Sequence, residues 1–280
     1  MKLEIGCELG YRVAEPTTFV LAIFATRLGE QKILDESFTT SPALDWEFGS
    51  SHEAATRIAR AAVPAGEISI AYRATVAPSC LYDDPDRIAE VAPDRLPLET
   101  LQYLNPSRYC ESDKIRDFAC TQFGALLPGY ARVNAICNWI YANIKYLGGS
   151  TSSTTSAIDT LAQREGVCRD FAHLGIALCR ALNIPARFVA AYAPGLVPQD
   201  FHAYFEAYLG SRWYVFDPTR MARQNALVRI GIGRDAADVS FATLFGTCEM
   251  QHMRIIANLI DPPESTLQSP EMTLAAVATL

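Results

Sequence analysis

The first residues of the chain alternate between apolar and polar positions. From Leu3 to Tyr11 every second residue is apolar, and charged residues or glycines lie between them. This period of two predicts a strand with one buried face. Similar patterns predict further extended segments at residues 18–26, 32–39, 44–48, 54–62 and 68–76. Strands at this spacing are typical of an antiparallel β-sandwich, so we expect one as an N-terminal domain at residues 1–100.

The pattern becomes helical in the second half of the chain. Residues 77–112 precede this change; they are rich in proline and acidic side chains and show no periodicity, which is typical of a connection between domains. Ser112 is the expected N-cap of the first helix. Apolar residues then recur with helical spacing, and helices are expected at residues 115–123, 133–144, 157–163 and 167–182.

Strands are expected again beyond the last of these helices. Asn183 and Pro185 end that helix, because proline cannot continue it. The strands are predicted at residues 186–192, 202–209 and 213–217. Together these elements predict a second domain at residues 101–265, followed by a frayed C-terminal tail of small residues at 266–280.

The composition is that of an ordinary globular protein. Half of the 280 residues are hydrophobic, 20% are charged, and the net charge is −7. No basic cluster is visible, so nucleic acid is not an expected partner. The apolar stretch from Phe19 to Ala25 is too short to span a bilayer, and Glu4 and Glu8 interrupt a secretory signal. We therefore expect no membrane partner and a cytoplasmic location.

The cysteine pattern argues against a disulfide scaffold and against zinc. The chain contains eight cysteines and no C-x-x-C pair. In a cytoplasmic protein most of them are expected to be reduced, buried and small side chains. No metal ion and no cofactor is therefore predicted.

One cysteine stands where a nucleophile belongs. Cys168 lies at the start of the helix expected at 167–182, where unpaired backbone N–H groups and the helix dipole favour a thiolate over a thiol. The residues that share its helical face are small or apolar, so Cys168 points toward packed protein. Two interpretations follow, a nucleophile or one more core cysteine, and the surroundings of Cys168 must decide between them.

The strands after this helix supply the other two groups. A two-residue turn at Gly210–Ser211 would place Tyr204 opposite Asp217. His202 lies two residues from Tyr204, on the same face of its strand, so Asp217 would be its diagonal neighbour across the hairpin. A three-residue turn would reverse the parity and separate the two groups. With the shorter turn, a carboxylate can orient an imidazole.

A thiol, an imidazole and a carboxylate form the set needed for acyl transfer. The imidazole takes the proton of the thiol and returns it to the leaving group. An oxyanion hole is also required, and the backbone N–H of Cys168 is its natural first donor. Gln163, Trp139 and Tyr146 are candidates for the second donor, and the sequence does not choose among them.

Several segments of the second half resemble a known family. They are GVCRDFAHL at 166–174, NIPARFV at 183–189, HAYFEAY at 202–208 and WYVFDPT at 213–219. Together they resemble the transglutaminase-like core, and the segment LPLETLQYLNPSRYCESD from residue 96, with the residues before it, is similar to the N-terminal region of the bacterial members. The resemblance implies a papain-like α+β domain behind a β-sandwich, with Cys168, His202 and Asp217 as its triad.

The resemblance leaves the reaction open. Relatives include transamidases, deamidases, peptidases and inactive scaffolds, so the preferred interpretation is a cysteine enzyme that forms a thioester with a peptide or protein substrate. The alternative is a non-catalytic module that binds peptides or proteins. Among the neighbouring polar residues, Asp170 is expected to stabilise the helix N-terminus, and His173 lies about 140° around the helix from Cys168, a poor position for a partner.

Overall fold

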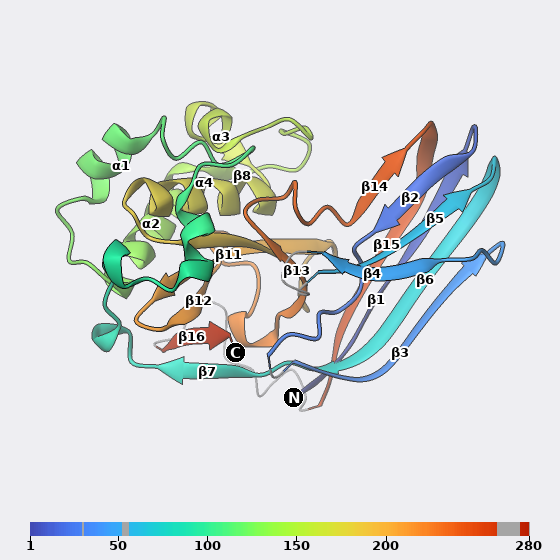
Figure 1. Cartoon of the computed structure of the whole chain (residues 1–280), viewed down its shortest axis with the longest axis horizontal. Coiled ribbons are helices and arrows are strands. Elements are labelled where there is room, and N and C mark those ends of the chain that lie inside the picture. The colour runs from blue at the N-terminus through green and yellow to red at the C-terminus, as the bar shows by residue number, and fades with distance from the viewer. Residues whose placement is uncertain (30, 52–55, 262–274, 280) are drawn as a thin grey trace.

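A computed structural model describes the chain except for residues 30, 52–55, 262–274 and 280. Figure 1 shows two lobes side by side, one built of long strands and the other of helices packed against a sheet. The mixed α+β architecture with an N-terminal antiparallel sandwich, expected from the sequence, is confirmed. None of the helices among the described residues is long and apolar enough to cross a membrane.

The sandwich consists of two four-stranded antiparallel sheets. One has the order β15 (Cys248–Asp261), β1 (Lys2–Val13), β6 (Gly66–Ala77) and β3 (Lys32–Ser41). The other has the order β14 (Ala242–Phe245), β2 (Thr17–Leu21), β5 (Thr56–Val63) and β4 (Glu47–Ser51). Alternate residues of β1, such as Leu3, Ile5 and Leu9, are fully buried in the core between the sheets. The alternation seen in the sequence therefore marks the inner face.

The second lobe contains a six-stranded sheet covered by helices. The sheet has the order β13 (Val228–Gly233), β10 (Ala186–Tyr192), β11 (Phe201–Leu209), β12 (Arg212–Phe216), β16 (Ala276–Thr279) and β7 (Cys80–Asp83). Its helices are α1 (Arg116–Phe123), α2 (Tyr130–Asn143), α3 (Ala157–Gln163) and α4 (Cys168–Ala181). Helix α4 packs against β10 and β11 and also contacts the other three helices, so it is the central element of this lobe.

The strand pairing differs from a simple division of the chain at residues 100 and 265. Strands β14 and β15 pair with β2 and β1, so the C-terminal half of the chain helps to build the sandwich. Strand β16, in the segment expected to be a frayed tail, pairs with β12 and β7, and its first three residues are buried. An alternating pattern predicts a strand, but it does not identify the sheet that the strand joins.

The proline-rich segment is also more ordered than a plain connection. It contains β7, the short 3₁₀ helices η1 (Pro85–Arg87), η2 (Pro93–Arg95) and η3 (Leu98–Leu104), and the buried residues Tyr103 and Cys110. The expected N-cap at Ser112 is wrong. Helix α1 begins at Arg116, and Ser112 is buried in the preceding turn, where its N–H donates to the carbonyl of Cys110.

Two hydrogen bonds join the lobes at strands β10 and β13 of the six-stranded sheet. The Tyr192 hydroxyl, at the end of β10, donates to the carbonyl of Ile23 over 2.7 Å, and its ring is buried in the sandwich core. The N–H of Ile232 in β13 donates to the hydroxyl of Thr56 in β5 over 3.2 Å. The edge strand β13 and its neighbour β10 are therefore held against the sandwich, and the candidate site lies beside them.

Candidate active site

Cys168 is the first residue of α4, as the sequence predicts. The residue before it, Val167, is extended, and its N–H donates to the Asp170 carboxylate over 2.9 Å. The Thr151 hydroxyl donates to the same oxygen over 2.8 Å, and the Arg169 guanidinium lies 3.0 Å from the other. The fully buried Asp170 therefore ties together the chain on both sides of Cys168, which agrees with its expected role at the helix N-terminus.

A glycine keeps this turn compact. A Cβ atom on Gly166 would lie 2.8 Å from the Cβ of Asp170, closer than real Cβ contacts allow. Short strand β9 (Glu165–Gly166) pairs in parallel with β8 (Lys145–Tyr146), with Tyr146 beside Gly166. Because Gly166 of β9 packs closely against Asp170 of α4, the paired strand β8 lies beside the N-terminus of α4.

The hairpin of β11 and β12 has the predicted register. Leu209 pairs with Arg212 across the turn, and Phe205 pairs with Phe216, so the turn holds two residues. Gly210 has a φ of 59°, a left-handed conformation that glycine adopts without strain. Just beyond the last pair, the Nε2 atom of His202 lies 2.8 Å from the Oδ2 atom of Asp217. The diagonal contact predicted from the turn length is present.

Asp217 is fully engaged by donors. Its Oδ1 atom accepts hydrogen bonds from the N–H and the hydroxyl of Thr219 over 3.0 and 2.7 Å. Its Oδ2 atom accepts from His202 and, over 3.3 Å, from the N–H of Ala222. Burial opposes ionisation of this carboxyl, but the charge of His202 and these hydrogen bonds outweigh it and lower the pKa of Asp217. The carboxylate is therefore stabilised in its charged form.

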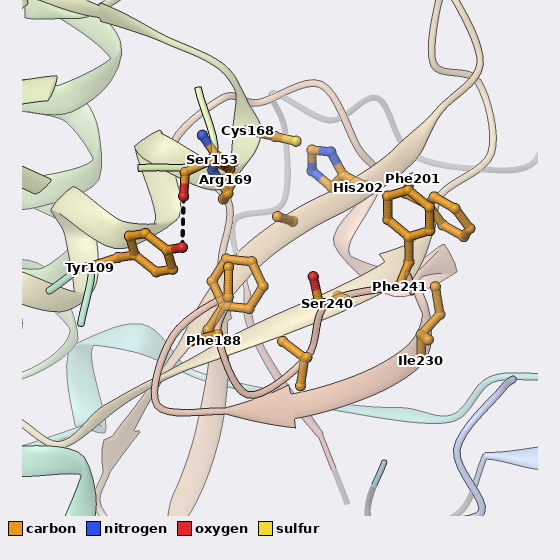
Figure 2. Close-up of a pocket in the computed structure, with 15 residues that line it drawn as sticks. Tyr109, Ser153, Cys168, Arg169, Phe188, Phe201, His202, Ile230, Ser240 and Phe241 are labelled. Atoms are coloured by element: carbon orange, nitrogen blue, oxygen red, sulfur yellow. Dashed lines mark hydrogen bonds between the residues drawn. The ribbon is translucent and has the colours of Figure 1, made fainter. Parts of the chain in front are cut away.

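Cys168 lies on the other side of the imidazole. Figure 2 shows its sulfur pointing toward the ring of His202, and Cys168 is close enough to influence the pKa of the imidazole. Because Nε2 faces Asp217, Nδ1 is the nitrogen free to face the thiol. Burial opposes protonation of His202, yet Asp217 and Cys168 together raise the pKa of the imidazole to about 10. The structure thus brings together all three residues that the sequence singled out.

Of the three candidates for a second oxyanion donor, Tyr146 is the one beside Cys168. Its hydroxyl lies close enough to Cys168 for the backbone N–H and the side chain of this cysteine to influence the pKa of the phenol. Burial and the neighbouring Cys168 raise the pKa of Tyr146, so its hydroxyl stays protonated and can donate. Trp139 packs instead against the rings of Phe118 and Phe123, and Gln163 is exposed at the end of α3.

His173 has a different role from that of the candidate triad. It is fully buried behind the site, and its Nε2 atom accepts a hydrogen bond from the N–H of Ala236 over 3.1 Å. Burial, with the charges of Arg169 and Arg180, lowers the pKa of His173 well below its usual value. A neutral His173 therefore holds the segment around Ala236. Within the described residues, no group of three or more His, Cys, Asp or Glu side chains could hold a metal ion.

A cavity of about 270 Å³ opens beside the thiol and the imidazole. Figure 2 shows Phe188, Ile230, Phe201 and Phe241 around it, below Cys168 and His202. These wall residues are not predicted from the sequence. They come from three strands, β10, β11 and β13, and from the loop before β14, and no local pattern distinguishes them from core residues.

Two family models match the chain. One, described as the transglutaminase-like superfamily, matches residues 116–218. The other, described as the bacterial transglutaminase N-terminal domain, matches residues 1–97. The first match includes Cys168, His202 and Asp217.

The chain is also similar to a solved structure and to curated proteins. The crystal structure of a candidate cysteine protease from Cytophaga hutchinsonii is 42% identical, with a TM-score of 0.95, over 99% of this chain and 97% of that chain. An uncharacterized protein of Mycobacterium leprae is 33% identical over 39% of this chain and 42% of its own length. One of Mycobacterium tuberculosis is 32% identical over 52% of this chain and 51% of its own length. The chain thus spans about half the length of the curated relatives it matches.

Proposed function

The chain belongs to the transglutaminase-like superfamily, and from this premise we propose that it is a cysteine-dependent enzyme acting on a peptide or side-chain amide through a thioester at Cys168. The observation that carries the proposal is the constellation at the site. The Cys168 thiol points toward an imidazole whose other nitrogen lies 2.8 Å from a buried carboxylate. The nucleophile, the base and the carboxylate needed for nucleophilic acyl transfer therefore lie next to one another.

In the first half of the proposed reaction, the Cys168 sulfur attacks the carbonyl carbon of the amide. The thiol proton passes to Nδ1 of His202, and Asp217 stabilises the resulting imidazolium. When the C–N bond breaks, His202 returns this proton to the leaving amine. The acyl group then remains on sulfur as a thioester.

In the second half, water or an amine attacks the thioester carbon. His202 takes one proton from the attacking group, and the departing sulfur recovers it as a thiol. Water gives hydrolysis, and an amine gives a new amide. We propose hydrolysis as the main outcome, because Cys168 is partly exposed and 42% of the neighbouring Tyr146 is open to solvent.

Tyr146 is the proposed second donor of the oxyanion hole. Its hydroxyl lies beside the Cys168 N–H, the group expected to stabilise the oxyanion. A substrate carbonyl oxygen bound between the Cys168 N–H and the Tyr146 hydroxyl would lie between two donors. The tyrosine O–H, released from its contact with the thiol, can then donate to the same oxygen.

The proposed function is tested with a thiol-reactive probe and with an internal reference. The intact protein is treated with iodoacetamide at pH 6 and digested, and the rate of adduct formation at each cysteine is measured by peptide mass spectrometry. Cys120 is exposed on α1 and serves as the ordinary thiol of the same sample. We expect Cys168 to react at least tenfold faster than Cys120, and this advantage to disappear in His202→Ala.

Equal rates at Cys168 and Cys120 would contradict the enzyme and favour the peptide-binding module. Turnover is then measured with a library of amide substrates, with and without a primary amine. If the amine adduct forms in place of the free acid, the reaction is transamidation and the proposal of hydrolysis is wrong. The cytoplasmic location and the peptide or protein substrate stay predictions.

A further inference from the structure

The cavity beside Cys168 and His202 is lined mainly by carbon. Its walls contain the side chains of Phe188, Ala190, Phe201, Ala203, Ile230, Ala236, Val239 and Phe241. Ligand cavities in proteins are usually about 300–1,000 Å³ and enclose a whole small molecule. At about 270 Å³ this one lies just below that range. Its size therefore fits a single large apolar group, with the reactive carbonyl outside, at Cys168.

The cavity contains no free charged group to meet a charged ligand. Among its described lining residues, Arg169 is the one cation besides the His202 imidazole. The Arg169 guanidinium lies 3.0 Å from the Asp170 carboxylate and donates to the carbonyl of Ser152 over 2.7 Å. The Tyr109 hydroxyl is likewise engaged, because it donates to the carbonyl of Ser153 over 2.7 Å. A charged substrate group would lose its hydration here without gaining a partner.

The outer wall of the cavity is formed by the segment 234–241, which is fixed by polar contacts. The N–H of Ala236 donates to the buried His173, as described above. Asp235 accepts hydrogen bonds from the N–H groups of Tyr109 and Ala237, each over 2.9 Å. Arg234 and Asp238 form a salt bridge at 3.0 Å. These contacts tie the segment to α4 and to the loop of Tyr109, so the cavity exists before any ligand binds.

The inner wall is equally constrained. Phe188 and Ala190 project from β10 and Ile230 from β13, the two strands held against the sandwich. The Phe188 ring packs on His173 with 5.1 Å between centroids. Phe201 and Phe241 stack on each other with 5.0 Å between centroids, at the border of the sandwich core. The sandwich therefore supports one side of the cavity.

We propose that this cavity is a specificity pocket, which binds an apolar side chain of a peptide substrate next to the amide that Cys168 attacks. The inference rests on the proposed function, because it assumes that Cys168 is the nucleophile. It adds the chemical class of the substrate: aromatic or branched aliphatic side chains are favoured, and charged side chains are rejected.

The test uses a series of iodoacetamide probes that differ only in the substituent on the amide nitrogen. Iodoacetamide, N-benzyl iodoacetamide and N-carboxymethyl iodoacetamide are applied to the full chain, and alkylation of Cys168 is followed by peptide mass spectrometry. The rate at Cys168 is divided by the rate of the same probe at Cys120. After this correction we expect the benzyl probe to react about tenfold faster than iodoacetamide, and the carboxymethyl probe to react more slowly than iodoacetamide.

Two variants fill the pocket, and one matched variant does not. Ala190→Leu and Ala237→Leu each enlarge a lining side chain from a methyl to an isobutyl group, whereas Ala142→Leu makes the same change on the exposed face of α2. In both pocket variants the ratio of the N-benzyl rate to the iodoacetamide rate at Cys168 should fall to the ratio measured at Cys120, and the control should keep the ratio of the original chain. If Ala190→Leu fails to fold, Ala237→Leu provides the test, because Ala237 is exposed and a larger side chain there does not disturb the core.

The outcomes separate the two proposals. Slow labelling of Cys168 by every probe would overturn the proposed function. Fast labelling without a benzyl preference, or a preference that survives both pocket variants, would overturn the specificity pocket and leave the nucleophile intact. If the alkylation rate of Cys168 keeps rising as the N-substituent is lengthened to dodecyl, the pocket binds a lipid chain. This result would also overturn the assignment to a peptide side chain.

Discussion

Replacing Asp217 with asparagine should disable the imidazole without removing it. The Oδ1 position receives two hydrogen bonds from Thr219, so the oxygen of the new amide is expected to remain there. Its NH₂ group then occupies the Oδ2 position and donates to Nε2 of His202. This forces the imidazole proton onto Nδ1, the nitrogen that must accept the proton of Cys168.

The expected magnitude follows from the environment of His202. Burial disfavours the imidazolium, but Asp217 and Cys168 raise the pKa of His202 from 6.5 to about 10. At about 1.4 kcal/mol for each tenfold change in proton affinity, this corresponds to a stabilisation on the order of 5 kcal/mol, of which Asp217 supplies the largest share. Without it the imidazolium no longer supports a thiolate. A free thiol, which ionises near pH 8.5, is about 1 part in 300 ionised at pH 6.

We therefore expect Asp217→Asn to slow iodoacetamide alkylation of Cys168 at pH 6 by about 100-fold, and to move the pH profile toward that of a free thiol. Thr219→Val is the matched control, because it removes the hydroxyl that donates to Asp217 and keeps the carboxylate. Loss of one such hydrogen bond costs about 1 kcal/mol, so the control should slow alkylation less than tenfold. Wild-type alkylation at pH 6 in Asp217→Asn would refute the role assigned to the carboxylate.

Three further outcomes are expected. Cys168→Ala should abolish turnover of amide substrates while the free energy of unfolding, from urea denaturation, changes by less than about 1 kcal/mol, because alanine is tolerated at the start of a helix; residual turnover would identify another nucleophile. Tyr146→Phe should slow acylation by an amide substrate about 10- to 100-fold but iodoacetamide alkylation less than threefold, because alkylation forms no oxyanion; equal losses in both assays would argue against the oxyanion role. Burial lowers the pKa of His173, so between pH 7 and 5 this residue becomes protonated in the unfolded chain but stays neutral in the folded chain. The free energy of unfolding should therefore fall by up to about 2 kcal/mol as the pH falls from 7 to 5. In His173→Gln this part of the pH dependence should vanish; an unchanged slope in urea denaturation would show that His173 is protonated in the folded state.

The residues themselves were sufficient to predict the parts of the site that depend on local geometry. Hydrogen bonding across a two-residue turn fixes the register of β11 and β12, and side chains alternate along each strand, so the contact of His202 with Asp217 follows from the spacing of these residues. Helical periodicity likewise predicts that Cys168 begins α4. The family resemblance supplied the link between the helix and the hairpin, which local patterns do not contain.

The tertiary structure decided which distant segments meet. An alternating strand can pair with any edge that accepts its buried face, and the choice depends on the packing of the whole chain. Strands β14 and β15 therefore join the sandwich, and β16 joins the other sheet, although their patterns resemble those of other strands. The contact of Tyr146 with Cys168 depends on the pairing of β8 with β9, two short segments with little pattern of their own. The cavity was beyond sequence analysis for the same reason. Its walls come from β10, β11, β13 and the segment 234–241, and an apolar side chain in a wall looks the same in sequence as one in a core, because burial is a property of the neighbours that the fold assembles.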